Sequence, residues 1–141
     1  MTGKTFVDTN ILIYAHDSAA GEKHLIARDR LKELWTDASG AVSPQVLQEF
    51  YVNVRRKLAK PLTNEQARNL AGSYSVWCTE ATYAEIRTAF RIEDETHISF
   101  WDALICASAL KCGAERILSE DLNHGQKIAG ILIENPFRRT Q

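Results

Sequence analysis

Short extended runs of apolar residues alternate along the chain with longer runs in which apolar residues recur at helical spacing. The extended runs, at residues 5–7, 41–43, 74–78, 116–119 and 131–133, are predicted to be strands. Helices are predicted between them, over residues 11–15, 22–37, 44–60, 63–72, 82–95 and 99–112. Because strands that alternate with helices indicate a parallel sheet covered on both faces, we predict an α/β fold with about four to five strands.

Polar residues mark where the predicted helices begin and end. The starts are indicated by Ser43 followed by Pro44, by Thr63 with Gln66, by Thr82 with Glu85, and by Ser99. Thr9 and Asn10 offer side-chain oxygens that would cap the first helix. Gly113 is expected to end the last one.

Composition narrows the class of protein. With 141 residues, the chain is expected to form one domain over residues 1–141. A formal net charge of −1 argues against a nucleic-acid binder driven by charge alone, but it allows a nucleic-acid enzyme with local basic patches. Three cysteines without CxxC spacing indicate reduced thiols. Since no apolar run approaches the roughly 18 residues of a membrane span, we expect a cytoplasmic protein with no membrane partner.

Four acidic residues occupy corresponding places in this alternation. Asp8 follows the first predicted strand and Asp121 follows the fourth, whereas Glu49 lies in the second turn of one predicted helix and Asp102 in the first turn of another. Right-handed crossovers carry every strand of a parallel sheet in the same direction, so all these junctions share one edge of the sheet. We therefore predict that the four carboxylates meet in one cleft.

A carboxylate cluster of this kind favours a metal ion. Carboxylates within about 4–6 Å repel one another, so some must be protonated or bind a cation. Oxygen ligands without a His or Cys partner select Mg²⁺ or Mn²⁺. A pair of such ions activates a water and stabilises the leaving oxygen of a phosphodiester. The pattern thus indicates hydrolysis of a nucleic acid, which the acidic cleft would repel until the metal had bound.

Each acid also has a structural interpretation. Asp8 and Asp121 suit turns that satisfy local backbone N–H groups. Asp102 suits the first helical turn after Ser99, where the helix dipole favours a negative charge. Glu49 lies about 160° around its helix from the apolar stripe, as a solvated residue would. The topological position that the four acids share, rather than any one of them, favours the metal site.

Four segments of the chain together resemble the PIN-domain family, and specifically the VapC-type toxins of prokaryotic toxin–antitoxin pairs. They are residues 6–12, 43–50, 99–105 and 118–125, and the resemblance extends over nearly the whole chain. It implies a Mg²⁺- or Mn²⁺-dependent endoribonuclease that forms a homodimer and is neutralised by a separate antitoxin protein. The implied substrate is an RNA, whether tRNA, rRNA or mRNA.

The resemblance also implies roles for individual residues. Asp8, Glu49, Asp102 and Asp121 become the metal ligands, directly or through water, and the supporting polar groups are Thr9, Ser119 and Asn123. For Thr9, a helix cap is an equal alternative. The cations Arg55, Arg56, Lys57 and Lys60 are candidates to hold RNA phosphates, or else they form a solvated helix end. Trp35, Phe50 and Tyr51 are candidates for a groove that receives the antitoxin, or else they pack in the core.

Other classes of α/β protein fit these residues less well. A haloacid-dehalogenase-like phosphatase would carry a second Asp where this chain has Asn10. A response-regulator receiver would need paired acids after the first strand and a phosphoacceptor Asp near residue 50. The alternative that remains is a PIN-like module that binds RNA or a partner protein without cleaving it. The four intact acids argue against that alternative.

Overall fold

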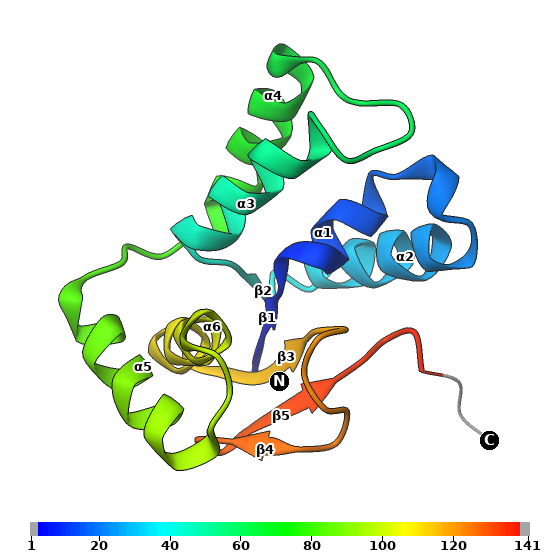
Figure 1. Ribbon diagram of the computed structural model, residues 1–141. Coiled ribbons are helices and arrows are strands. Elements are labelled where there is room, and N and C mark those ends of the chain that lie inside the picture. The colour runs from blue at the N-terminus through cyan, green and yellow to red at the C-terminus, as the bar shows by residue number, and fades with distance from the viewer. Residues whose placement is uncertain (1–2, 139–141) are drawn as a thin grey trace.

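A five-stranded sheet forms the centre of the fold in the computed structural model, which describes residues 3–138. The strand order is β2-β1-β3-β5-β4 (Figure 1). The parallel strands are β1 (Lys4–Val7), β2 (Gly40–Ala41), β3 (Ala114–Leu118) and β5 (Ile131–Glu134), and β4 (Lys127–Ile128) pairs antiparallel with β5. The predicted α/β fold with a mostly parallel sheet is confirmed.

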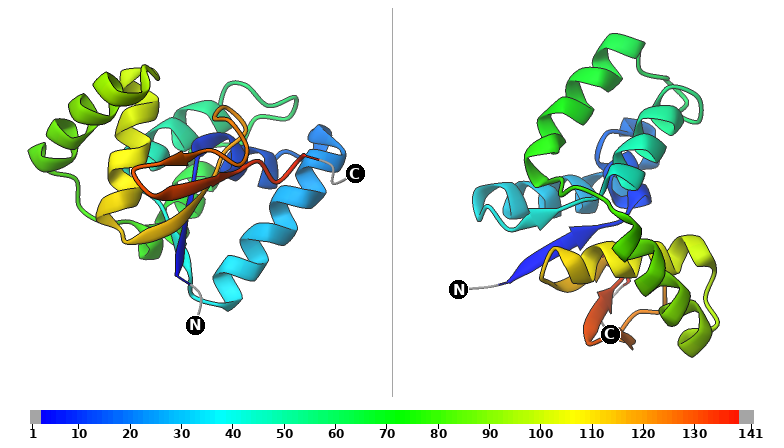
Figure 2. Two further views of the ribbon diagram at one scale, coloured as in Figure 1. Left: turned by 90° about the horizontal axis from the view of Figure 1, so that it is seen from below. Right: turned by 90° about the vertical axis from the view of Figure 1, so that its left-hand side faces the viewer.

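Helices lie on both sides of this sheet. They are α1 (Thr9–Ala15), α2 (Glu22–Thr36), α3 (Pro44–Val54), α4 (Asn64–Tyr74), α5 (Tyr83–Thr96) and α6 (Phe100–Lys111), with 3-10 turns η1 (Ser18–Ala20) and η2 (Ser75–Trp77). The views in Figures 1 and 2 agree that α5 and α6 lie on one side of the sheet and α2 on the other. Within the described part of the chain, no helix has the length and apolar character needed to cross a membrane.

The core fixes the start of α6 close to the sheet. Phe6 and Ile117, on the adjacent strands β1 and β3, are fully buried, and burial of such a side chain stabilises the fold by about 1.5–3 kcal/mol. On α6 the small side chains of Ala103 and Ala107 are also buried, which lets this helix pack closely. Asp102, directly before Ala103, is therefore held at a defined place beside the sheet.

Four of the predicted helix starts and one predicted end are confirmed, each where a local capping group specifies it. The hydroxyl of Ser43 accepts the N–H of Val46, and that of Ser99 accepts the N–H of Asp102. Both predicted capping boxes form, Thr63 with Gln66 and Thr82 with Glu85. Gly113 follows α6 in the left-handed conformation, with φ +73°. Local polar chemistry is thus enough to set these starts and this end.

The prediction of a strand over residues 74–78 is wrong. This segment forms the 3-10 turn η2, and only Cys78 makes a parallel bridge, to Val42. Its aromatic side chains pack on other elements, because Trp77 lies against the backbone of Gly40, where an added Cβ would come within 2.5 Å of the ring. Long-range packing therefore overrides the local preference of these residues for an extended chain.

Other boundaries differ by a few residues from the predicted ones. The helix predicted over 44–60 ends at Val54, since the N–H of Leu62 bonds the carbonyl of Val54 and folds residues 55–60 into turns. The strand predicted over 41–43 covers only Gly40–Ala41. The first helix begins at Thr9, two residues earlier than predicted. Strand β4, of two residues, has no counterpart among the predicted elements.

Candidate functional site

Asp8 is the buried centre of the candidate site. It follows β1 and caps α1, because its carboxylate accepts the N–H of Thr9 at 2.7 Å. The second carboxylate oxygen accepts the hydroxyl of Ser119 at 2.9 Å. Asp8, rather than the predicted Thr9 or Asn10, is therefore the cap of the first helix. Its two oxygens are held by groups that follow the adjacent strands β1 and β3.

The surroundings of Asp8 disfavour its charge. Burial raises the pKa of its carboxyl from 3.8 to about 6, although the bonds from Ser119 and Thr9 act to lower it. The nearby charges of Asp121 and Asp102 raise this pKa further. Since proximity of like charges is one of these causes, Asp8, Asp102 and Asp121 share one electrostatic environment.

Asp121 is positioned by two groups, one from the start of the chain and one from its own loop. The amide of Asn10 donates to its carboxylate at 3.0 Å, and its backbone N–H bonds the hydroxyl of Ser119 at 3.2 Å. Ser119 thus links Asp8 and Asp121 through one fully buried hydroxyl. Partial burial raises the pKa of the Asp121 carboxyl, and so do the nearby charges of Asp102 and Glu120. The hydrogen bond from Asn10 acts to lower this pKa.

Glu49 and Asp102 approach the same place from two helices. The hydroxyl of Thr9 donates to the carboxylate of Glu49 at 3.0 Å, so Thr9 contacts Asp8 through its N–H and Glu49 through its side chain. Asp102 lies in the first turn of α6. Burial raises the pKa of the Cys106 thiol to about 12, and the nearby charges of Asp102 and Asp8 contribute to this increase. All four predicted acids therefore lie around the carboxyl ends of β1 and β3.

The donor set suits a hard divalent cation. It consists of carboxylate oxygens with no His or Cys aimed at them, and within residues 3–138 no ion pair forms between any of the four acids and a Lys or Arg. The cluster is open, since no three His, Cys, Asp or Glu side chains of the described chain stand where one ion would reach them all. The exposed carboxylates of Glu49 and Asp121 would have to turn towards Asp8 to enclose a metal.

A neighbouring group, which sequence reasoning missed, supports the loop that carries Asp121. Glu120 accepts the hydroxyl of Tyr14 at 2.8 Å and forms an ion pair with Lys23. The ammonium of Lys23 lies 5.1 Å from the centre of the Tyr14 ring. Lys23 neutralises the acid directly beside Asp121. The sequence offered no local signal for it, because Lys23 and Glu120 are 97 positions apart.

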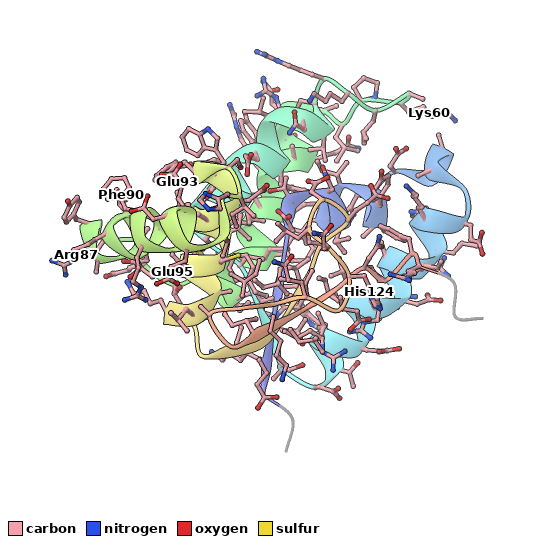
Figure 3. The ribbon with its side chains drawn as sticks, turned by 60° about the horizontal axis from the view of Figure 1, so that its bottom comes forward. Lys60, Arg87, Phe90, Glu93, Glu95 and His124 are labelled. Carbon is pink, nitrogen blue, oxygen red and sulfur yellow. The ribbon has the colours of Figure 1, made fainter. Side chains whose placement is uncertain are left out.

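Within residues 3–138, no hydrogen bond or ion pair links the side chains of the remaining predicted residues to the four acids. Asn123 is exposed in the loop after β3, where its carbonyl accepts the N–H of Gln126. The cations lie in the turn that follows α3, from which Lys60 points outward in Figure 3; they are Arg55, Arg56, Lys57 and Lys60. Arg55 is engaged locally, because its guanidinium bonds Asn64 at 2.7 Å and lies 4.4 Å from the centre of the Tyr51 ring.

The three aromatic residues predicted to line a groove do not share one. Phe50 is fully buried and packs edge-on against Tyr74. Tyr51 lies under Arg55. Trp35 is half-exposed and lines a shallow groove of about 230 Å³ between α1, α2 and the end of α4. The core interpretation therefore holds for Phe50.

The fold and the acidic edge define an α/β protein with a candidate metal centre at the carboxyl ends of its central strands. The family model of the PIN domain matches residues 5–129, so the chain belongs to the PIN-domain family. A comparison with curated protein sequences gave no match.

Solved structures share this fold at low sequence identity. VapC20 of Mycobacterium tuberculosis, described as a sarcin-ricin loop cleaving toxin, is 22% identical, with a TM-score of 0.60 over 84% of this chain and 90% of that one. A toxin–antitoxin complex from Klebsiella pneumoniae gives 18% identity and a TM-score of 0.69 over 96% and 100% of the two chains. VapBC2 of Rickettsia felis, bound to a promoter DNA fragment, gives 18% and 0.65 over 92% and 96%.

Proposed function

We propose that this chain is a metal-dependent endoribonuclease and the toxin of a toxin–antitoxin pair. The observation that carries the proposal is the buried Asp8, whose pKa is raised to about 6 beside Asp102 and Asp121. A buried acid that is disfavoured by its acidic neighbours is stabilised by a bound cation. Membership of the PIN-domain family and the toxins among the solved structures with this fold support the same conclusion.

The proposed chemistry divides between the metal and the chain. Mg²⁺ or Mn²⁺, when bound, activates a water and stabilises the leaving oxygen of the phosphodiester. Asp8, Glu49, Asp102 and Asp121 hold the metal, directly or through water. Thr9 and Ser119 orient Asp8 through the bonds that they donate to it, and Asn10 orients Asp121. The hydrogen bonds to Asp8 hold its carboxylate in place before the metal arrives, whereas Glu49 and Asp121 turn towards it when the metal binds.

The proposed partners are an RNA, a separate antitoxin protein and a second copy of the chain, in the cytoplasm. The solved complexes from Klebsiella and Rickettsia pair a toxin of this fold with an antitoxin, which supports that partner. The RNA class is left open among tRNA, rRNA and mRNA. Because the mycobacterial toxin is described as cleaving the sarcin-ricin loop, a structured ribosomal fragment that carries a loop belongs in the test.

Cleavage of total tRNA and of a ribosomal RNA fragment tests this function. We expect the purified protein to cut at discrete positions with Mg²⁺ or Mn²⁺ and not with EDTA. We expect the cleavage rate of Asp8→Asn to be at least about 100-fold lower, because the loss of a residue that only supports a metal ligand already costs up to about 100-fold. Asp94→Asn, which removes an exposed acid of α5, should cut like the wild type. Equal cutting by the wild type and Asp8→Asn would reject the site. RNA binding without cleavage would favour the non-catalytic module.

A further inference from the structure

A large aromatic side chain stands in solvent directly beside the acidic cluster. Trp101, in the first turn of α6, is 64% exposed although it immediately precedes Asp102. Its indole packs edge-on against Phe100, with ring centres 5.2 Å apart, and Phe100 in turn packs against Phe90 of α5 at 5.8 Å. Figure 3 shows Phe90 on the outer side of α5. We call these three residues the aromatic platform.

The aromatic platform restricts the motion of the Trp101 indole and leaves this residue exposed to solvent. Contacts between ring edges and faces are favourable and directional, so Phe100 restricts the orientations of Trp101. Successive helical residues point about 100° apart, which sets the indole beside the carboxylates rather than among them. Trp101 and Asp102 leave α6 from the same turn of the helix.

Charged side chains of both signs surround this place. The cluster is acidic, and Glu93 and Glu95 lie at the end of α5 that leads to the platform. Among the candidate cations, Arg55 is already held by Asn64 and Tyr51. The carboxylates of the cluster would repel a phosphate before a metal binds, whereas the exposed Arg87 and Arg91, one turn before and directly after Phe90, would attract one. An uncharged nucleobase depends on neither charge. Base stacking on an aromatic ring needs no cation and accepts any base.

We propose that Trp101 stacks an unpaired nucleobase next to the phosphate that the metal centre cleaves. This proposal rests on the proposed nuclease function for the position of that phosphate. A base becomes available for stacking only where it is free of its own duplex partner, which excludes a fully paired helix at this position. The indole supplies an anchor that does not depend on the sign of the charges around it.

A second copy of the chain is the competing occupant, and the chain offers a residue that separates the two. Tyr83, at the start of α5, is as exposed as Trp101, at 64%. It lies at the opposite end of the α5–α6 pair, because the ion pair between Glu85 and Lys111 joins the start of α5 to the end of α6. The length of α6 places Tyr83 about 18 Å from the level of Trp101. A protein partner covering this face would contact both residues, whereas a stacked base would contact Trp101 alone.

The test is equilibrium binding of a 2′-O-methyl RNA hairpin with an unpaired loop, in Mg²⁺, by the wild type, Trp101→Ala, Trp101→Phe and Tyr83→Ala. We expect Trp101→Ala to weaken binding roughly 5- to 150-fold, the range for loss of one stacked base. Trp101→Phe should recover part of the loss, and Tyr83→Ala should bind like the wild type. An abasic nucleotide at one loop position should weaken wild-type binding to a similar degree and leave Trp101→Ala unchanged.

The proposal would be overturned if Trp101→Ala bound the hairpin as tightly as the wild type, or if the wild type did not bind it. It would also be overturned if the abasic nucleotide weakened binding by the same factor in the wild type and in Trp101→Ala. Equal losses in Trp101→Ala and Tyr83→Ala, with a dimer-to-monomer change in sedimentation, would assign the face to a second copy instead. Cleavage of natural RNA by the same wild-type preparation reports separately on the nuclease. If the protein cleaves RNA but Trp101→Ala binds the hairpin normally, the nuclease function is supported and the stacking role of Trp101 is rejected. If Trp101→Ala weakens binding but the protein does not cleave RNA, the stacking role is supported and the nuclease function is rejected.

Discussion

Asp8 shows how one residue serves both the fold and the site. Its carboxylate caps α1 and accepts the hydroxyl of Ser119, and an Asp at this place would be retained for those bonds alone. Burial nevertheless raises its pKa to about 6, which a capping role does not require. Without a bound cation, the charge on this group opposes folding at neutral pH.

The pH dependence of stability follows from that shift. The unfolded chain releases the Asp8 proton near pH 3.8 and the folded chain near pH 6, so the folded state binds the extra proton between these values. Stability in EDTA should therefore fall from about pH 4 to pH 6 by up to about 3 kcal/mol and stay low above it.

We expect Asp8→Asn to stabilise the metal-free protein by about 1–2 kcal/mol at pH 7.5. The substitution removes the buried charge, keeps a good helix cap, and loses about 1 kcal/mol because an amide oxygen cannot replace both carboxylate acceptors. Urea unfolding in EDTA measures the difference at pH 7.5 and at pH 4, where the gain should disappear. A variant that is less stable than the wild type at pH 7.5 would show that Asp8 carries no unfavourable charge.

The helix pair α5–α6 is the element on which both Asp102 and the aromatic platform depend. Its far end is joined by Glu85, which is buried and forms an ion pair with Lys111 at 2.6 Å. Burial of Glu85 acts to raise its pKa, but the bonds from Lys111 and Thr82 prevail and lower it to about 2. The stability that Glu85 contributes is therefore present above about pH 4.5 and is lost as the pH falls towards 2.

Lys111→Met should destabilise the protein by about 1–2 kcal/mol at pH 7, less than the roughly 3–5 kcal/mol of a fully buried pair, because the Lys111 side chain is 37% exposed. Thermal unfolding at pH 7 and pH 3 measures this loss, which should shrink at the lower pH. Lys32→Met, on the exposed face of α2, is the control and should change little. A loss of equal size at both pH values would contradict the ion-pair account.

The elements show which parts of the structure are predictable from sequence. Helix starts such as Ser99 are set by an oxygen and an N–H within three residues, so a local pattern was sufficient. Strand β4, which pairs with the neighbouring β5, was missed because it has only two residues. Turn η2 was missed because it depends on a partner distant in the chain, as Trp77 depends on Gly40. Long-range packing decides such segments.

The candidate site likewise has a part that was predictable from the sequence and a part that was not. The shared edge of Asp8, Glu49, Asp102 and Asp121 was predictable, because it follows from the direction of parallel strands. The groups that orient these acids were not, because the bond from Asn10 to Asp121 spans 111 positions and no spacing rule indicates it. The topology of the sheet brings the four acids to one edge, and hydrogen bonds between segments distant in the chain orient their carboxylates.

At the scale of the whole molecule, the acidic edge and the nearly neutral net charge set the conditions for binding RNA. With a formal net charge of −1, the chain has no general attraction for phosphates, so a bound cation has to reverse the local charge first. The central claim is therefore that Asp8, Glu49, Asp102 and Asp121 form one divalent-metal site.

Mn²⁺ binding followed by electron paramagnetic resonance tests that claim most directly. We expect saturable binding by the wild type and by Asp94→Asn, and at least about tenfold weaker binding when any one of the four acids is replaced by its amide. Circular dichroism of each variant would show that the fold is retained. Undiminished Mn²⁺ binding by the four amide variants would contradict the claim that these carboxylates form the site.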